Sequence, residues 1–172
     1  MKNLLKAILL SVIVLLSFSR SYAQKEKIDK KAARIAAVQK MIDTADFVFY
    51  AQKAYPQHGN ATNLSDNYSF TASNGEIDCL LPYFGTVQVA SMDFTDQGVK
   101  FNTKDFDYFV QQKDFGWNVL FKPNSKTGVA MKDVKEITMS IKTNKTASLQ
   151  LSFANRERIV FDGIIEKAKG KG

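Results

Sequence analysis

The sequence predicts an α+β fold, in which an N-terminal helix packs on a curved antiparallel β-meander or incomplete barrel. Two observations support this prediction. Apolar side chains recur at spacings of three and four between about residues 25 and 44, which is the period of an amphipathic helix. From residue 47 onward the period changes to two, and eight or nine short alternating segments follow with turn-length connections. Short strands in such a series favour a meander over βαβ units.

The predicted helix has a single apolar stripe, with Lys and Asp on its other side. The stripe consists of Ile28, Ala32, Ile35, Val38 and Ile42. A helix with one apolar stripe is stable only when that stripe is covered, so we expect it to lie on the sheet.

The predicted strands begin with residues 47–50, which are aromatic and β-branched. Asn74-Gly75 stands between two alternating segments and is the strongest short-range signal for a hairpin. The later alternating segments are residues 99–103, 106–110, 117–121, 137–141, 149–153 and 159–161, the last closing the set before Gly163.

Alternation of period two buries one face of a sheet and leaves the other in water. Leu80, Phe109, Leu120 and Val160 are apolar but fall on the face that should be solvated. We therefore expect the helix to cover part of that face. Cys79 falls on the inner face, so it is expected to be a buried structural thiol.

The first 23 residues have the pattern of a cleavable export signal. Two lysines precede an apolar run over residues 7–16, and Ser21-Tyr22-Ala23 supplies a small-x-small cleavage site. The run is shorter than the roughly 20 residues that a membrane-spanning helix needs. We expect cleavage after Ala23, a mature single globular domain over residues 24–172 without a transmembrane segment, and a location in the periplasm or cell envelope.

Charge argues against a nucleic-acid partner. The full chain has 24 Lys and Arg against 17 Asp and Glu, and three of those bases precede residue 24, so the mature net charge is +4 rather than +7. Much of the excess lies at the two ends, in residues 25–31 and 167–171, where lysines usually form solvated tails. The single cysteine excludes an intramolecular disulfide.

Three segments together resemble a known family. They are residues 63–68 (Asn-Leu-Ser-Asp-Asn-Tyr), 81–85 (Leu-Pro-Tyr-Phe-Gly) and 156–163 (Arg-Glu-Arg-Ile-Val-Phe-Asp-Gly). In this order they are similar to a secreted family of Bacteroides-type bacteria, domain of unknown function 4251, over most of the mature chain. The resemblance implies an exported protein, and it implies no activity.

No catalytic or metal-binding constellation is found in the sequence. His58 is the only histidine and lies in a polar loop without a nucleophile motif, which favours a solvated side chain over a catalytic base. One His and one Cys do not make the usual four-ligand zinc site. Asp105 and Asp107 share one strand face, where solvated carboxylates are the simpler interpretation. We expect no enzyme activity and no cofactor.

The candidate ligand-binding residues are Tyr83, Phe84 and Arg156. Pro82 and Gly85 bracket the two aromatic residues at a strand end, where binding loops are often found. The alternative is that both rings plug the end of the core. Arg156 and Arg158 lie on one side of the chain and can bind an anionic group or form surface ion pairs.

The sequence therefore favours an exported, non-catalytic binding or interaction module. One alternative is a carrier, in which the curved sheet encloses a cavity for a small apolar ligand. A second alternative is a hydrolase that uses carboxylates. The partner is an unknown protein or a small apolar ligand, and the oligomeric state stays open.

The signal sequence predicts that the exported protein begins at Gln24. Intact-mass measurement of protein recovered from outside the cytoplasm checks this, with allowance for cyclisation of an N-terminal Gln. A mass that retains residues 1–23 would contradict the prediction.

Overall fold

The computed structural model describes residues 27–65, 67–85, 98–124 and 133–169. The predicted export signal and its cleavage site after Ala23 lie outside these residues. Residues 27–43 are helical, and contacts divide the chain into two units between Ala37 and Val38. No helix in the described ranges is long and apolar enough to span a membrane.

After the helix, the described residues form ten strands. They are β1 (Phe47–Pro56), β2 (Thr62–Asn63), β3 (Ser69–Ser73), β4 (Glu76–Pro82), β5 (Gly98–Thr103), β6 (Phe106–Lys113), β7 (Gly116–Pro123), β8 (Val134–Lys142), β9 (Thr146–Phe153) and β10 (Ile159–Lys167). Every pairing between them is antiparallel. The predicted α+β class with a curved antiparallel meander is confirmed.

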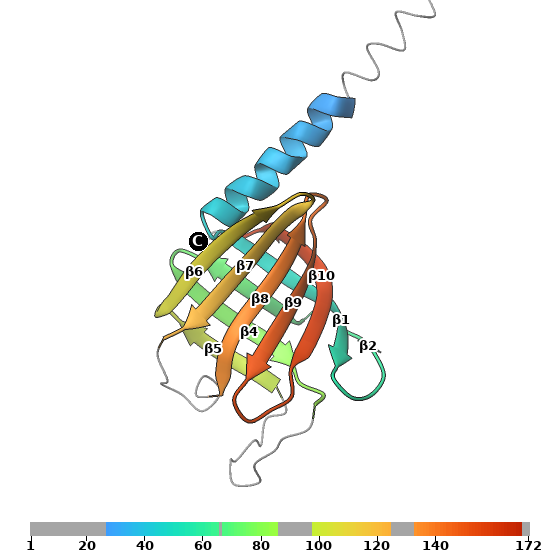
Figure 1. Ribbon diagram of the computed structural model, residues 1–172, viewed down its shortest axis with the longest axis vertical. Coiled ribbons are helices and arrows are strands. Elements are labelled where there is room, and N and C mark those ends of the chain that lie inside the picture. Colours follow the sequence, from blue (N-terminus) through green and yellow to red (C-terminus); the bar gives the residue numbers. More distant parts are fainter. Residues whose placement is uncertain (1–26, 66, 86–97, 125–132, 170–172) are drawn as a thin grey trace, which may run out of the picture. The chain divides into compact units, whose positions relative to one another are not determined.

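The sheet is a meander whose first and last long strands pair. Its order is β5-β4-β3-β1-β10-β9-β8-β7-β6, with the short β2 added beside β1. β5 and β6 follow each other in the chain but stand at opposite ends of this order. The sheet therefore curls into a half-barrel that is closed between β1 and β10 and open between β5 and β6 (Figure 1).

The closing pair, β1 with β10, contains an irregularity and a close approach. The register shifts between Ala51 and Lys53, which makes Gln52 the extra residue of a bulge. Gly163 lies opposite Ala51, and a Cβ at Gly163 would overlap the carbonyl oxygen of Tyr50. The sequence-based end of the last strand before Gly163 is wrong, because this glycine lies inside β10, where the two backbones meet closely.

The predicted Asn-Gly hairpin is confirmed between β3 and β4. Asn74 and Gly75 have φ values of 53° and 70°, as a type I′ turn requires at both central positions. This turn sets the register in which Ser73 lies opposite Glu76 and Phe70 lies opposite Cys79.

The core fills the concave inner face. An aromatic cluster centred on Phe121 of β7 links the two sides of the opening: its ring centroid lies 5.1 Å from Phe70 of β3 and 6.3 Å from Phe47 of β1. Phe106 and Tyr108 of β6 lie 5.9 and 4.9 Å from the same ring. Such edge-to-face and tilted pairs are the arrangements that aromatic rings favour in cores.

The last turns of the helix belong to the same unit as the sheet. Val38, Met41 and Ile42 are buried. The Tyr108 hydroxyl donates a hydrogen bond of 2.6 Å to the Ile42 carbonyl, and burial raises the pKa of this tyrosine.

None of the four apolar residues that we expected to lie under the helix is fully buried. Leu80 and Phe109 are 42% and 56% exposed, and Leu120 and Val160 are half-buried. In the unit from Val38 on, the end of the helix lies on the side of Tyr108, whose ring packs on the core residue Phe121, and it leaves Leu80 and Phe109 exposed.

Cys79 is fully buried on the inner face of β4, as the alternation predicted. Its thiol lies 3.7 Å from the Val99 carbonyl oxygen, and burial strongly raises its pKa. The thiol is thus kept protonated, which is the inert state of a buried cysteine.

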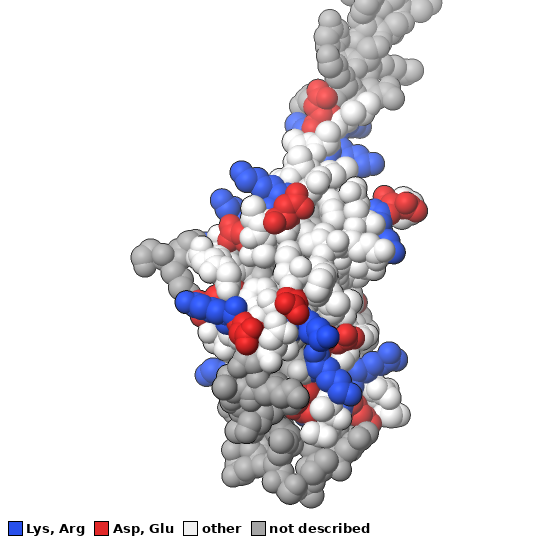
Figure 2. Space-filling view, turned by 60° about the vertical axis from the view of Figure 1, so that its left-hand side comes forward, with Lys and Arg blue, Asp and Glu red and all other residues white. Residues whose placement is uncertain are grey.

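Charged side chains of both signs are interspersed on the surface. Figure 2 shows Lys and Arg beside Asp and Glu, with uncharged areas between them. The face in view has no extended area of a single sign.

Candidate functional site

The segment Pro82-Tyr83-Phe84-Gly85 follows β4, and its tyrosine points inward. The Tyr83 ring is buried, and its hydroxyl donates a 3.1 Å hydrogen bond to the carbonyl oxygen of Glu157, just before β10. Burial is the main cause of a raised pKa for this hydroxyl. The bond ties the end of β4 to the start of β10, two segments 74 positions apart in the chain.

Gly85 has a steric role in the same turn. A Cβ at this position would overlap the hydroxyl and ring of Tyr83. The chain therefore folds back over the tyrosine ring two residues earlier, and only a glycine leaves room for it. This explains why the aromatic pair is followed by Gly.

Arg156 stacks between aromatic rings beside Tyr83. Its guanidinium carbon lies 4.9 Å from the Tyr83 ring centroid and 4.2 Å from that of Phe153, and the two rings meet edge-on at 5.5 Å. Arg156 is buried, in contrast to the surface position that an ion-pair cluster or an open anion site requires. Tyr83 and Arg156, two of the three candidate binding residues, are thus brought together.

Asp133 compensates the buried positive charge. One carboxylate oxygen, Oδ2, accepts a 2.6 Å hydrogen bond from Arg156 Nε, and the other accepts one of 2.7 Å from the Asn155 backbone N–H. The Asp133 carbonyl oxygen also accepts a 2.7 Å bond from the Ala154 N–H. Asp133 is fully buried, so this ion pair holds the start of β8 to the turn between β9 and β10.

Sequence reasoning did not find Asp133. The residue stands alone before an alternating segment and matches no motif. Its partner lies 23 positions away, and only the pairing of β8 with β9 brings the two together. An isolated Asp ahead of a strand, with an Arg after the next strand, is too weak a signal to pair them.

Phe84 has a different environment from its neighbour. It is 45% exposed, whereas Tyr83 beside it is buried. The expectation that both rings plug the core therefore describes Tyr83 only. The backbone at Phe84 is held in place, because Tyr83 before it is anchored by a hydrogen bond and by a ring contact.

The other residues considered for chemistry lie on the surface. His58 is 73% exposed in its side chain, and its Nδ1 lies 3.0 Å from the Glu157 carboxylate. Asp105 and Asp107 are exposed, as is Arg158. Within the described ranges, no group of three or more His, Cys, Asp or Glu side chains is arranged to hold a metal ion.

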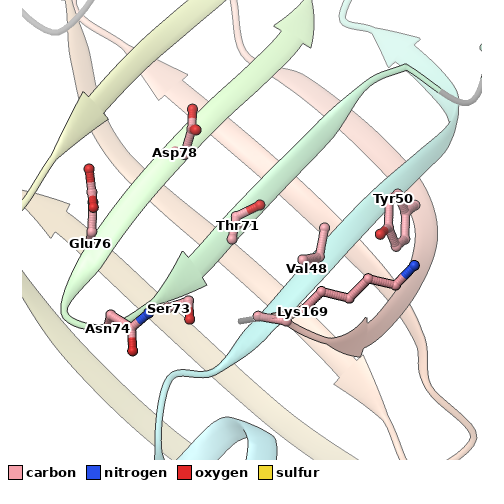
Figure 3. Close-up of a pocket in the computed structure, with 9 residues that line it drawn as sticks. Val48, Tyr50, Thr71, Ser73, Asn74, Glu76, Asp78 and Lys169 are labelled. Carbon is pink, nitrogen blue, oxygen red and sulfur yellow. The ribbon is translucent and has the colours of Figure 1, made fainter. Parts of the chain in front are cut away.

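A hollow lies on the outer face of β1, β3 and β4, with a volume of about 220 Å³. Glu76 and Asp78 project from β4 on this face, and the Lys169 amine lies beside Tyr50 (Figure 3). Hydroxyls of Thr71 and Ser73 complete its polar lining, although the Ser73 hydroxyl already donates to Asp46 at 2.8 Å. The lining carries charges of both signs, from Glu76, Asp78 and Lys169.

The packing of the inner face tests whether the half-barrel has room for a small apolar ligand, as the carrier alternative requires. Large side chains that are fully buried fill it, among the described residues Phe47, Phe49, Phe70, Phe121, Phe161, Ile77, Leu81, Ile137, Met139, Ile141 and Leu149. Ring contacts of 4.9 to 6.3 Å around Phe121 cross the interior. This is the packing of a protein core and favours a filled half-barrel over a ligand cavity.

The fold is an α+β half-barrel. At one end of it, which we call the loop end, Tyr83 after β4, Asp133 before β8 and Arg156 before β10 close the core. The chain matches the family model described as "Domain of unknown function (DUF4251)" over residues 29–165, and it belongs to this family. Its fold is similar to the crystal structure of a DUF4251 family protein from Bacteroides eggerthii DSM 20697, determined at 1.95 Å. The TM-score is 0.59 and the identity 12%, over 80% of this chain and 91% of that one. No curated protein matches the chain.

The buried ion pair predicts a large effect on stability. Replacing Asp133 with Ala leaves Arg156 buried without its carboxylate, so the free energy of unfolding should fall by about 3–5 kcal/mol, measured by urea denaturation. His58→Ala, which removes an exposed contact to Glu157, is the control and should change it by less than about 1 kcal/mol. Equal small effects of both substitutions would mean that the Asp133 ion pair is solvated.

Proposed function

We propose that this protein is an exported, non-catalytic binding module of the periplasm or cell envelope, and that Phe84 is its main contact with a protein partner. The export pattern of residues 1–23 and the resemblance to a secreted family support the compartment. The arrangement around Phe84 supports the contact.

The observation that carries this proposal is the opposite burial of two neighbouring aromatic residues. Tyr83 is anchored by the Glu157 carbonyl and by the Phe153 ring, whereas Phe84 is 45% exposed. Aromatic side chains contribute strongly at interfaces. A side chain whose backbone is already fixed loses less conformational entropy on binding.

Arg156 and Tyr83 take a supporting role in this proposal. Arg156 is stacked and ion-paired with Asp133, so it holds the loop end rather than reaching toward a ligand. The three candidate residues thus divide into one contact residue and two positioning residues. Substitution of a positioning residue should weaken both stability and binding, whereas substitution of Phe84 should weaken binding alone.

The proposal of a non-catalytic module is supported by the surroundings of the titratable side chains. His58, Asp105 and Asp107, the side chains that the sequence offered for chemistry, are all exposed. An enzyme of the carboxylate type needs acid and base groups set in different environments, which exposed strand carboxylates do not have.

Photo-crosslinking in the host cell tests this function. A photoreactive phenylalanine analogue at position 84 should give one discrete adduct with a different protein, and the same analogue at Phe115, an exposed aromatic on the β6–β7 turn, should not capture that partner. The partner identified from the adduct should then bind purified protein at least about tenfold more weakly after Phe84→Ala, because aromatic anchors dominate interfaces.

The control variant Phe115→Ala should leave that affinity unchanged, and the melting temperature of Phe84→Ala should stay near that of the unsubstituted protein. Adducts of equal yield at positions 84 and 115, or unchanged affinity after Phe84→Ala, would contradict the proposal.

A further inference from the structure

Among the strands that the structure describes, β6 forms a free edge of the sheet. Among the described residues it pairs with β7 alone, and β5 ends the sheet on the other side. Its residues from 109 to 113 are all exposed. Figure 2 brings forward the left-hand side of Figure 1, where β6 lies, and uncharged surface separates the charged groups there.

Backbone groups along half of β6 point to this edge. The Asn124 N–H donates a 3.0 Å bond to the Asp105 carbonyl, which places the odd-numbered residues of this strand in hydrogen-bonded pairs with β7. Because the pattern alternates, the even-numbered residues direct their N–H and C=O groups away from β7. Among these, Val110 and Gln112 are exposed.

In the part of the chain that the structure describes, β6 has no bulge, proline or inward-pointing charge against edge-to-edge pairing, and its charged residues are Asp107 and Lys113. The β6–β7 register runs from Phe106 to Lys113 without a shift, so the strand has no bulge. It contains no proline and no charged residue on its inner face. Phe109 and Val110 are 56% and 40% exposed. Natural proteins usually protect an edge of this length with a bulge, a proline or an inward charge.

We propose that β6 is a self-association surface, on which β6 of a second copy pairs antiparallel about a two-fold axis at Val110. In this register Val110 lies opposite Val110 of the second copy, and Tyr108 lies opposite Gln112, so even-numbered residues with free backbone groups face one another. Asp107 then lies opposite Lys113 of the second copy, and the reverse pair forms on the other side of the axis.

Charge complementarity favours this register. Both ion pairs join exposed side chains on the outer face of the extended sheet. A shift by two residues removes Asp107 from Lys113, and a shift by one places inner residues on the outer face and misaligns the backbone groups. Phe109 lies diagonal to Phe109 of the second copy, within reach for aromatic side chains.

A single pair of eight-residue strands makes a small interface, below the roughly 1,200 Å² of a stable complex. The dimer should therefore be weak and concentration-dependent. Opposite charges across a strand pair contribute about 0.2–1 kcal/mol each, so reversing one sign at both symmetric positions should weaken it by about tenfold.

Sedimentation velocity of the exported chain, from about 5 µM to about 1 mM, tests the proposal through the fraction of dimer. Asp107→Lys alone and Lys113→Asp alone should each weaken association by about tenfold, because each creates like-charge pairs across the axis. The double variant Asp107→Lys with Lys113→Asp restores opposite charges and should associate as the unsubstituted chain does.

Val110→Pro tests the backbone pairing separately. Proline removes the N–H that faces the second copy and leaves the bonds to β7 in place, so this variant should fold and stay monomeric. Val110→Thr keeps the N–H and a branched side chain, and should still dimerise. Circular dichroism melting of both variants shows whether the fold is kept.

A monomer throughout the concentration range would overturn the proposal. A dimer that survives Val110→Pro, or one that both single charge variants leave unchanged, would also overturn it. The proposal does not depend on the proposed role of Phe84, because β6 and the segment after β4 are tested by different variants and measurements.

Discussion

The pairing of β1 with β10 is the contact on which the rest of the structure depends. It joins the first and last long strands of the meander, from Phe47 opposite Lys167 to Pro56 opposite Ile159. Contacts between segments so distant in sequence carry a large loop-closure cost, which local hairpins do not. Once the pair is formed, all inner faces turn toward one core, and the sheet has its free ends at β5 and β6.

The same closure explains the chemistry of the loop end. Curling brings the end of β4, the start of β8 and the turn before β10 together, and their side chains close the end of the core. A buried arginine there is tolerated because Asp133 and two aromatic rings surround its guanidinium. The loop end is therefore rigid where Tyr83 lies, and this rigidity is what gives the exposed Phe84 its proposed significance.

Much of the fold follows from local sequence patterns. The helix, the alternating strands and the Asn74-Gly75 hairpin depend on neighbours in the chain, and the sequence predicted each of them. The bulge at Gln52 and the passage of β10 through Gly163 depend on how two distant backbones meet, so alternation alone missed them. The Asp133–Arg156 pair was missed for the same reason. Leu80 and Phe109 break the alternation on an exposed face, and one sequence does not show whether a helix or a second chain covers such residues.

The half-barrel has a packed inner face and a solvent-exposed outer surface. Its described interior is filled by phenylalanine, isoleucine and leucine side chains, and a hollow of about 220 Å³ lies on the outer face of β1, β3 and β4. The two contacts that we propose, through Phe84 and through the edge of β6, lie on parts of the described surface that closure leaves exposed.

Hydrogen exchange at single-residue resolution, on dilute protein, tests most directly whether the sheet closes at β1–β10 and opens at β6. The account predicts that amides of β1 and β10 are among the slowest to exchange, because they open only with global unfolding. In β6, the amides of Phe109 and Gln111 should be protected, and those of Val110 and Gln112 should exchange rapidly. Fast exchange throughout β10, together with protection of Val110 and Gln112 in the dilute monomer, would contradict the account by showing that the sheet closes on the other side.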